Sequence, residues 1–271
     1  MMNKNENQKY MFCRLCDGIL GGFFTGKILG KYEVEYYKCS KCYSVQSENP
    51  YWLDEAYSQK KYNLDTGALQ RNLNNFASCY ILSKILSTNK VIDFGGKDGL
   101  LCRFLRDHSI ECYVYDKYSS PEYALDFQHK PDTHNIDMVL AFEVIEHFAN
   151  PKSDIDEIFR LQSNYIVVTT ELYSNQGKDW WYFARETGQH IFFYTVEAIN
   201  LIADNYGYGV TLVGGYILFY KKNIPEIHNK LISLNSILNG WIFQAIKSYI
   251  FLLPTPGVQT DFDFIKSKIL S

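Results

Sequence analysis

The sequence predicts an α/β fold: a doubly wound, mostly parallel sheet with a small cysteine-bearing ribbon before it and a helical segment after it. Apolar strand-like stretches alternate with helical stretches from Val91 onward. A glycine-rich turn in the segment VIDFGGKDGLL joins the first of these strands to a helix. Two CxxC pairs come before both features. We therefore expect a ribbon (1–48), a helical linker or lid (49–90), an α/β domain (91–223) and a helical C-terminal extension (224–271).

The composition is that of a globular protein without a strong electrostatic field. The 271 residues are 46% hydrophobic and 21% charged, and the formal net charge is −3. Because no basic field exists to hold a phosphate backbone, nucleic acid is not an expected partner. The first residues, MMNKNENQKYMF, contain no apolar core of a secretory signal. Paired thiols and the missing signal together favour a reducing cytoplasm.

Two cysteine pairs define the N-terminal ribbon. The spacing Cys13-x-x-Cys16 and Cys39-x-x-Cys42 fits two knuckles that converge on one tetrahedral zinc ion. A chance pairing or a redox dithiol is the alternative, but a redox CxxC normally stands alone at a helix start. Four thiolate ligands leave no open coordination position, so the zinc is expected to be structural. Three further cysteines lie on apolar stretches and are expected to be core thiols: Cys79, Cys102 and Cys112.

Each element of the domains follows from a local pattern. Tyr32–Lys38 reads as a strand, and apolar residues three and four apart in ALQRNLNNFASCYILSKIL predict a linker helix with Leu69, Phe76 and Ile81 on its apolar face. The expected parallel strands are Lys90–Phe94, Glu111–Tyr115, Ile136–Phe142 and Tyr165–Thr170. The expected helices are Leu100–His108, Asp154–Gln162 and Thr195–Tyr206. Gly209–Val213 and Tyr216–Lys221 read as an antiparallel pair at the sheet edge.

The glycine turn is followed by acidic residues at the ends of the next strands. Gly95 and Gly99 let the backbone turn sharply and let a ligand approach closely. Asp116 ends the second strand, where a carboxylate accepts the hydroxyls of a ribose in nucleoside-binding sheets. The cluster Glu143-Val-Ile-Glu146-His147 ends the third, at the carboxyl edge of the sheet where ligands bind.

These motifs, in this order over about 91–222, resemble the class I methyltransferases that use S-adenosylmethionine. A dinucleotide dehydrogenase is the runner-up, but DFGGKDG is not GxGxxG. The resemblance implies a Rossmann-like domain whose cofactor-binding residues are Asp93, Gly95, Gly96, Gly99, Asp116 and Glu143. Lys97 replaces the middle glycine of the family loop, which lies against the methionine part of the cofactor. Its side chain is expected to face solvent, with the cofactor carboxylate or an anionic acceptor as alternative partners.

An aromatic stretch follows the fourth strand, and its end, GQHIFFYT, resembles a segment common in these methyltransferases. The resemblance implies that this connection caps the cofactor pocket. Arg185 within it could clamp an anion, and His190 is our candidate general base because histidine titrates near neutral pH. Glu186 and His147 are the alternatives for that role.

A cysteine ribbon ahead of a class I domain resembles the sugar C-methyltransferases that act on nucleotide-linked deoxysugars. Those enzymes read C-x-x-C-G-x-V-Q at the second knuckle, where this chain has Tyr43 in place of glycine, and they carry a further C-terminal α/β domain. The resemblance implies methylation of a sugar or nucleotide-linked sugar in surface-glycan or natural-product biosynthesis. One alternative is O-methylation of a phosphorylated or other anionic small molecule. Another is a non-catalytic zinc-ribbon scaffold with a degenerate cofactor fold. Methylation of RNA or protein is disfavoured because no basic stripe exists.

The stretch Ser236–Leu253 is densely apolar but is interrupted by Gln244 and Lys247. No uncharged apolar run is long enough to predict a stable membrane span. A buried helix is the favoured interpretation. A dimer surface, giving a homodimer through the C-terminal helices, and an interfacial anchor are the alternatives.

Overall fold

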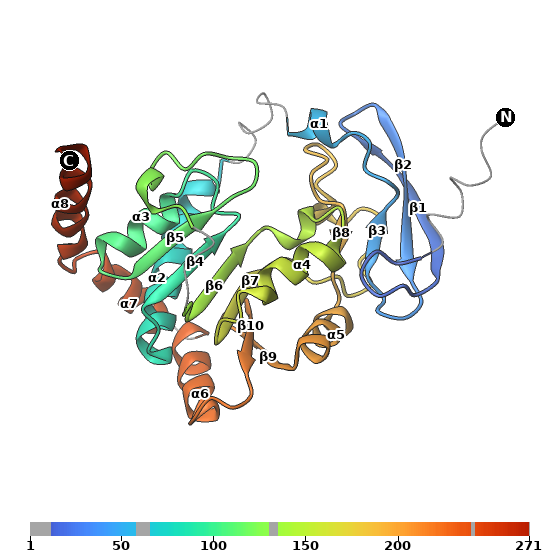
Figure 1. The fold of residues 1–271 in the computed structure, drawn as a ribbon. Helices are drawn as coiled ribbons and strands as arrows, with labels where there is room; N and C mark the ends of the chain where they lie inside the picture. Colours follow the sequence, from blue (N-terminus) through green and yellow to red (C-terminus); the bar gives the residue numbers. More distant parts are fainter. Residues whose placement is uncertain (1–11, 58–65, 130–134, 240–241, 271) are drawn as a thin grey trace. The chain divides into compact units, whose positions relative to one another are not determined.

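The computed structural model describes residues 12–57, 66–129, 135–239 and 242–270 (Figure 1). Residues 1–11 of the expected ribbon and 58–65 of the expected linker lie outside this range. The chain forms two compact units. The first combines the chain up to Thr66 with Glu143–Arg160 and Thr170–Gly207, and the second contains Gly67–Phe142, Leu161–Thr169 and the chain from Tyr208 onward.

The second unit is built on a six-stranded sheet. Its strand order is β5 (Glu111–Tyr115), β4 (Lys90–Phe94), β6 (Met138–Phe142), β7 (Tyr165–Thr169), β10 (Tyr216–Lys221) and β9 (Tyr208–Val213). The first four strands are parallel to one another, and β10 is antiparallel to both β7 and β9. The strands are apolar along most of their length because both faces of a parallel sheet are covered. The predicted α/β class with a mostly parallel sheet is confirmed.

Helices of the second unit pack against this sheet or against one another. They are α2 (Ala68–Leu86), α3 (Leu100–Asp107), α6 (Ile227–Leu238), α7 (Ile242–Ile250) and α8 (Pro256–Leu270). Phe76 and Ile81 of α2 are buried in one apolar cluster with the strands, as the periodicity predicts. Leu69 is the exception, because it lies in the first turn of α2 and is 60% exposed. The three expected core thiols, Cys79, Cys102 and Cys112, are all fully buried.

The helix α8 is fixed to α3 by a buried ion-pair network. Asp261 is 5% exposed and accepts from the guanidinium groups of Arg103, at 2.6 Å, and Arg106, at 2.7 and 2.8 Å. Gly257 lies so close to the end of α3 that an added Cβ would meet the Arg106 carbonyl oxygen at 1.8 Å. Only glycine permits this approach. The position of α8 therefore depends on Gly257 as well as on the ion pairs of Asp261.

The expectation of a single buried helix over Ser236–Leu253 is wrong. The stretch includes the end of α6, residues 240–241, which lie outside the described range, and α7. Ile250 is buried, whereas Tyr249 is 63% exposed. The dimer interpretation is untested by this structure and stays a prediction. No helix in the described part of the chain combines the length and the apolar character that crossing a membrane requires.

The first unit contains a four-stranded antiparallel sheet. Its order is β1 (Leu20–Ile28), β2 (Tyr32–Cys39), β3 (Val45–Ser47) and β8 (Phe192–Phe193). Strands β1 and β2 form a hairpin, and β8 arrives from far along the chain to pair Phe193 with Val45. Aromatic side chains fill the core beside this sheet, including the fully buried Tyr36, Phe183 and Phe193. The aromatic stretch that sequence analysis placed over a pocket is therefore also a structural part of the cysteine-bearing sheet.

Short helices complete the first unit: α1 (Leu53–Ala56), α4 (Pro151–Arg160), α5 (Val196–Tyr206) and the 3-10 turns η4 (Ile145–His147) and η5 (Trp181–Phe183). The ends of α5 follow from its sequence. The Thr195 hydroxyl accepts from the Ala198 amide at 3.1 Å, and Gly207 ends the helix in the left-handed conformation with φ 73°. Thr195 also donates to the Cys42 carbonyl oxygen, which ties α5 to the second cysteine knuckle.

Candidate functional site

The glycine turn occupies the carboxyl end of β4 in the second unit. Gly95 and Gly99 have φ angles of 74° and 79°, in the left-handed region that favours glycine. A Cβ at Gly96 would lie 2.5 Å from the Asp93 carboxylate, so this position also requires glycine. Lys97 has φ 48° and is exposed. A lysine therefore adopts a left-handed backbone conformation that glycine adopts more easily, at a cost of about 1 kcal/mol.

Asp93 is an acidic group buried beneath this turn. It is 3% exposed, and its Oδ2 atom has no hydrogen-bond partner. Burial raises the pKa of Asp93 to about 7, and the negative charges of Asp98 and Asp116 add to the rise. A cationic ligand at the turn would reverse this effect by stabilising the carboxylate.

Asp116 follows β5, which pairs with β4 so that Phe94 lies opposite Tyr115. Its carboxylate accepts three backbone amides: from Lys97 at 3.0 Å and from Tyr118 and Ser119 at 2.8 Å each. These bonds join the glycine turn to the loop after β5. The expected ribose acid therefore connects two loops through hydrogen bonds, which its position at the end of a strand did not predict.

The predicted cofactor-binding residues of the second unit fit S-adenosylmethionine. The turn offers glycine backbone at three positions, with an orphaned carboxylate oxygen below it and a half-buried carboxylate on the adjacent strand end. The cofactor carries a positive sulfonium and a positive amine, and both charges suit an acidic surrounding.

A second group of candidate functional side chains lies in the first unit around Tyr182. The Tyr182 hydroxyl contacts Glu146 Oε1 at 2.8 Å, the Thr170 hydroxyl at 3.1 Å and Glu143 Oε2 at 3.4 Å. Glu143 and Thr170 come directly after the neighbouring strands β6 and β7. Glu146 is fully buried, and burial raises its pKa to about 8, with the negative charge of Glu143 adding to the rise. Sequence reasoning missed Tyr182, whose only signal is its place in an aromatic stretch.

His147 and His190 belong to this same group. Ligand atoms of Glu146, His147 and His190 all lie within 4.8 Å of one another. His147 Nδ1 lies 3.0 Å from the Gln189 carbonyl oxygen, and His190 Nδ1 lies 2.8 Å from the Tyr182 carbonyl oxygen. Because a carbonyl oxygen only accepts, each Nδ1 carries a proton, and Nε2 is the atom that has a lone pair when the ring is neutral. Two of the three candidates for the general base are thus brought together.

The third candidate, Glu186, is exposed and does not belong to this group. Arg185, expected to clamp an anion, is engaged in packing instead. Its guanidinium lies 5.3 Å from the centre of the Phe24 ring and 5.9 Å from that of Phe183, and it donates to the Lys178 carbonyl oxygen. The structure therefore gives no support to an anion clamp at this residue.

The four cysteines of the ribbon converge as their spacing predicts. Their sulfur atoms all lie within 4.8 Å of one another, with Cys13 Sγ 3.7 Å from Cys42 Sγ and Cys16 Sγ 3.5 Å from Cys39 Sγ. Zinc–sulfur bonds of about 2.3 Å in a tetrahedron place the sulfurs about 3.8 Å apart, so the cluster is compatible with zinc. Gly18 permits this convergence, because a Cβ there would lie 2.7 Å from Cys39 Sγ.

The second knuckle has Tyr43 where the resemblance leads us to expect glycine. Cys39 Sγ accepts backbone amides from Lys41 at 3.3 Å and from Cys42 at 3.4 Å. Tyr43, the residue in place of glycine, has φ 59° and a half-exposed ring. Tyrosine therefore adopts the left-handed turn that glycine would adopt, as Lys97 does in the other unit.

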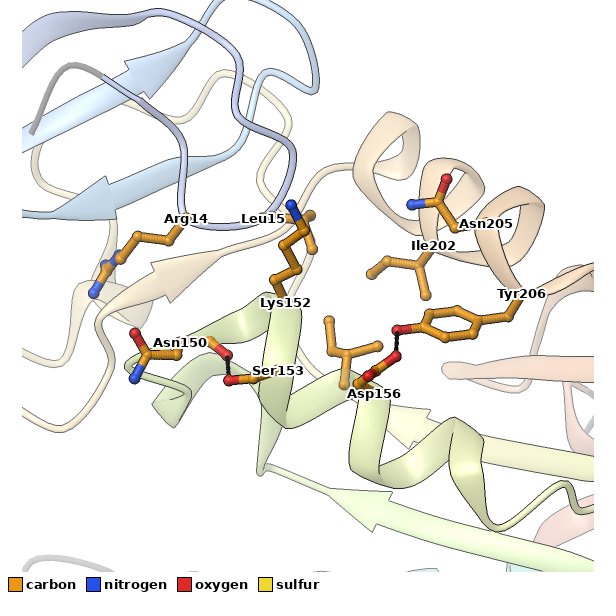
Figure 2. Close-up of a pocket in the computed structure, with 10 residues that line it drawn as sticks. Arg14, Leu15, Asn150, Lys152, Ser153, Asp156, Ile202, Asn205 and Tyr206 are labelled. Carbon is orange, nitrogen blue, oxygen red and sulfur yellow. Dashed lines mark hydrogen bonds between the residues drawn. The ribbon is translucent and has the colours of Figure 1, made fainter. Parts of the chain in front are cut away.

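The first unit also has an open pocket of about 570 Å³, lined by residues of the first knuckle, α4 and α5 (Figure 2). Several of its polar side chains have partners elsewhere in the protein or within the lining. Tyr206 donates to Asp156 at 2.7 Å, and Lys152 pairs with Asp17 at 2.7 Å. Arg14 donates to the carbonyl oxygens of Ser47, Ala149 and Ile191. None of the predicted site residues lines this pocket, and its polar groups do not converge on a ligand.

Several solved structures resemble this chain at low identity. The methyltransferase domain of bacterial CtHen1-C is 21% identical, with 55% of this chain and 98% of that chain covered and a TM-score of 0.43. An O-methyltransferase family protein from Burkholderia thailandensis is 13% identical, with 63% and 62% covered and a TM-score of 0.46. The plantazolicin methyltransferase BamL is also 13% identical, with 73% and 86% covered and a TM-score of 0.47. At TM-scores of this size these resemblances have no bearing on the acceptor.

A search of curated proteins finds no match to this chain. Residues 63–213, more than half of the sequence, match the family described as "Methyltransferase domain". That range contains the glycine turn with Asp93 and Asp116 as well as the Glu146, His147 and His190 group. The chain therefore belongs to this methyltransferase family, and the protein is an S-adenosylmethionine-dependent methyltransferase.

Proposed function

We propose that the enzyme transfers the methyl group to a sugar or nucleotide-linked sugar. The observation that carries this proposal is the group of Glu146, His147 and His190 beside the Tyr182 hydroxyl. A sugar hydroxyl, or a carbon next to a sugar carbonyl, must lose a proton as the methyl group arrives. Two imidazoles with fixed tautomers and a buried carboxyl group suit that requirement. The combination of a cysteine ribbon with a methyltransferase domain supports the sugar class by resemblance.

The donor is proposed to lie at the glycine turn. Gly95, Gly96 and Gly99 let the backbone approach it, Asp93 faces its positive charge, and Asp116 accepts ribose hydroxyls. S-adenosylmethionine supplies a methyl group on a sulfonium, so the protein's main contribution is alignment of donor and acceptor. Glu143, which has φ 52° and follows β6 directly, is proposed as a further cofactor contact.

When no metal ion is bound nearby, His190 is proposed to act as the general base that takes the proton from the acceptor. Its Nδ1–H bond to the Tyr182 carbonyl oxygen, 2.8 Å long, holds the ring so that Nε2 is the basic atom. His147, held in the same way by Gln189, is the first alternative. Glu186 is the second, but its exposure outside the group makes it the weaker candidate.

The four cysteines are proposed to hold structural zinc. Three of the four are buried, and they bring the loop before β1 together with the end of β2 and the turn after it. A metal ion bound there would hold these segments together. The measurement is the zinc content of the purified protein, and a full complement of zinc released only by denaturation is expected.

A second candidate acceptor is an anionic small molecule such as a phosphorylated metabolite. The exposed Lys97 in the cofactor turn favours it. The packing of Arg185 against Phe24 and Phe183 weakens it, because that guanidinium has other partners. Replacing Lys97 with glycine tests its role: a phosphorylated acceptor that Lys97 contacts should show a raised KM, whereas the KM of a neutral sugar should not change.

The test has two stages, so that donor and acceptor are judged separately. Calorimetric titration with S-adenosylhomocysteine should show saturable binding, and an absence of binding would remove the donor site at the glycine turn. A panel of nucleotide-linked sugars and phosphorylated acceptors is then incubated with S-adenosylmethionine carrying a labelled methyl group. Label in a sugar product supports the proposal, and NMR of that product assigns the methyl to oxygen or carbon. Label only in anionic non-sugar acceptors would overturn the sugar class.

A further inference from the structure

The group formed by Glu146, His147 and His190 has features beyond those that a proton acceptor needs. Two imidazoles and one carboxylate place their ligand atoms within 4.8 Å of one another. Two nitrogens and one oxygen form a ligand set that first-row divalent cations accept, with coordination positions left open. The four-cysteine cluster differs in kind, because its ligands are all thiolates and its geometry is closed.

Both histidines are held as metal-binding histidines usually are. Each donates Nδ1–H to a backbone carbonyl oxygen, His147 to Gln189 and His190 to Tyr182. Such a bond fixes the tautomer, orients the ring and makes Nε2 a better ligand. A single histidine held in this way is common, but here two of them lie beside a buried carboxylate.

The carboxylate of Glu146 supplies an independent observation. Its residue is fully buried, and Oε1 accepts the Tyr182 hydroxyl at 2.8 Å, whereas Oε2 is buried with no hydrogen-bond partner. A buried carboxylate oxygen without a hydrogen-bond partner is unfavourable, because it has lost its contacts with water. A cation beside Oε2 would offset that loss. The backbone helps to fix the site, because the Ile191 amide donates to the Glu146 carbonyl oxygen at 2.9 Å.

We propose that Glu146, His147 and His190 bind a divalent first-row cation such as Mn²⁺, through one carboxylate oxygen and the two Nε2 atoms. Three protein ligands leave positions that water or oxygens of the acceptor can occupy. A cation there would lower the pKa of an acceptor hydroxyl, and the two histidines would then serve as ligands. Binding of the cation does not depend on the proposed function, but this use of it in sugar methylation does.

The test uses the full-length, zinc-loaded protein and Mn²⁺ alone. Mn²⁺ is chosen because it prefers nitrogen and oxygen ligands, so it leaves the four-thiolate cluster occupied by zinc. Electron paramagnetic resonance follows the loss of the free aqueous Mn²⁺ signal, and we expect saturation at one ion per chain. Pulsed measurements on the bound ion should show nitrogen hyperfine coupling from coordinated imidazole. An absence of saturable binding, or of nitrogen coupling, would overturn the proposal without the use of any variant.

Variants locate the site. His190→Gln and Glu146→Gln should each weaken Mn²⁺ binding about 10-fold or more. The matched control is His108→Gln, because His108 lies in the second unit and its Nδ1 also faces a backbone carbonyl oxygen, that of Phe104, at 3.0 Å. Zinc content and thermal unfolding establish that each variant is folded. Wild-type Mn²⁺ affinity in both cluster variants would refute the assignment.

Failure of this inference can be told apart from failure of the proposed function. Mn²⁺ binding without transfer to any sugar would leave the metal site and remove the acceptor class. Transfer to a sugar that a Mn²⁺ chelator does not affect, in protein that binds no Mn²⁺, would leave the function and return His190 to the role of general base.

Discussion

Asp93→Asn should change the pH dependence of stability. Burial raises the pKa of Asp93 from 3.8 to about 7, so the folded protein holds this proton more tightly than the unfolded chain does. Stability from this group is therefore present at low pH and is lost as the pH rises through about 7. Asparagine cannot ionise, so the variant should escape this loss.

The size of the effect follows from the shift. About three pKa units at about 1.4 kcal/mol each give about 4 kcal/mol between the two limits. By proton linkage, about 2 kcal/mol of this contribution to the unfolding free energy is lost between about pH 5.5 and about pH 8. Relative to the wild type, the variant should gain about that much unfolding free energy over the interval. At about 2–4 °C per kcal/mol, this gain corresponds to about 4–8 °C in Tm.

The assay is thermal unfolding of the cofactor-free protein at a series of pH values. Other groups that titrate in this range, including the cysteine cluster, are shared by both proteins and cancel in the difference. Asp98→Asn is the matched control, because the Asp98 charge contributes to the raised pKa of Asp93. It should reduce the pH dependence without abolishing it. Parallel profiles for Asp93→Asn and wild type would refute the reasoning, because they would mean that Asp93 is ionised throughout.

Three further outcomes are expected. Asp116→Ala should weaken S-adenosylhomocysteine binding by about 1.5–3 kcal/mol in calorimetry, and unchanged affinity would leave Asp116 with only its three amide bonds to the turn. Cys39→Ser should lower the zinc content and the Tm, measured beside Cys102→Ala as a thiol control; full zinc occupancy in Cys39→Ser would contradict the cluster. His190→Ala should cut turnover about 100-fold with little change in cofactor affinity, whether it acts as base or ligand, and wild-type turnover would exclude both roles.

Local chemistry made most of the second unit predictable. The strand Lys90–Phe94 and the pair Gly209–Val213 and Tyr216–Lys221 are observed within one residue of expectation, because turns and glycines bound each run. The helix after Thr195 is specified by its cap, and Gly207 ends it. The convergence of the four cysteines was predictable, because two CxxC pairs at this spacing are typical of a four-cysteine metal site.

Long-range features were not predictable in the same way. Nothing near Phe193 in the sequence indicates pairing with Val45, because strand pairing depends on the whole chain path. The approach of His190 to Glu146 depends on that same path. Tyr182 is recognised as part of the candidate site only from the contacts of its hydroxyl group. The division of Ser236–Leu253 had a local signal, the Asn-Gly pair at 239–240, which the dense apolar pattern outweighed.

The pairing of β8 with β3 means that the region of family similarity lacks one strand of a sheet to which it contributes. The match covers residues 63–213 and so includes Phe192 and Phe193, while their partner strand lies at Val45–Ser47. Both rings are fully buried in the intact protein. A protein trimmed to the matched range would expose two phenylalanines and a bare strand edge, which favours aggregation. The matched range therefore contains the proposed site residues but omits the strand beside which two of its buried side chains lie.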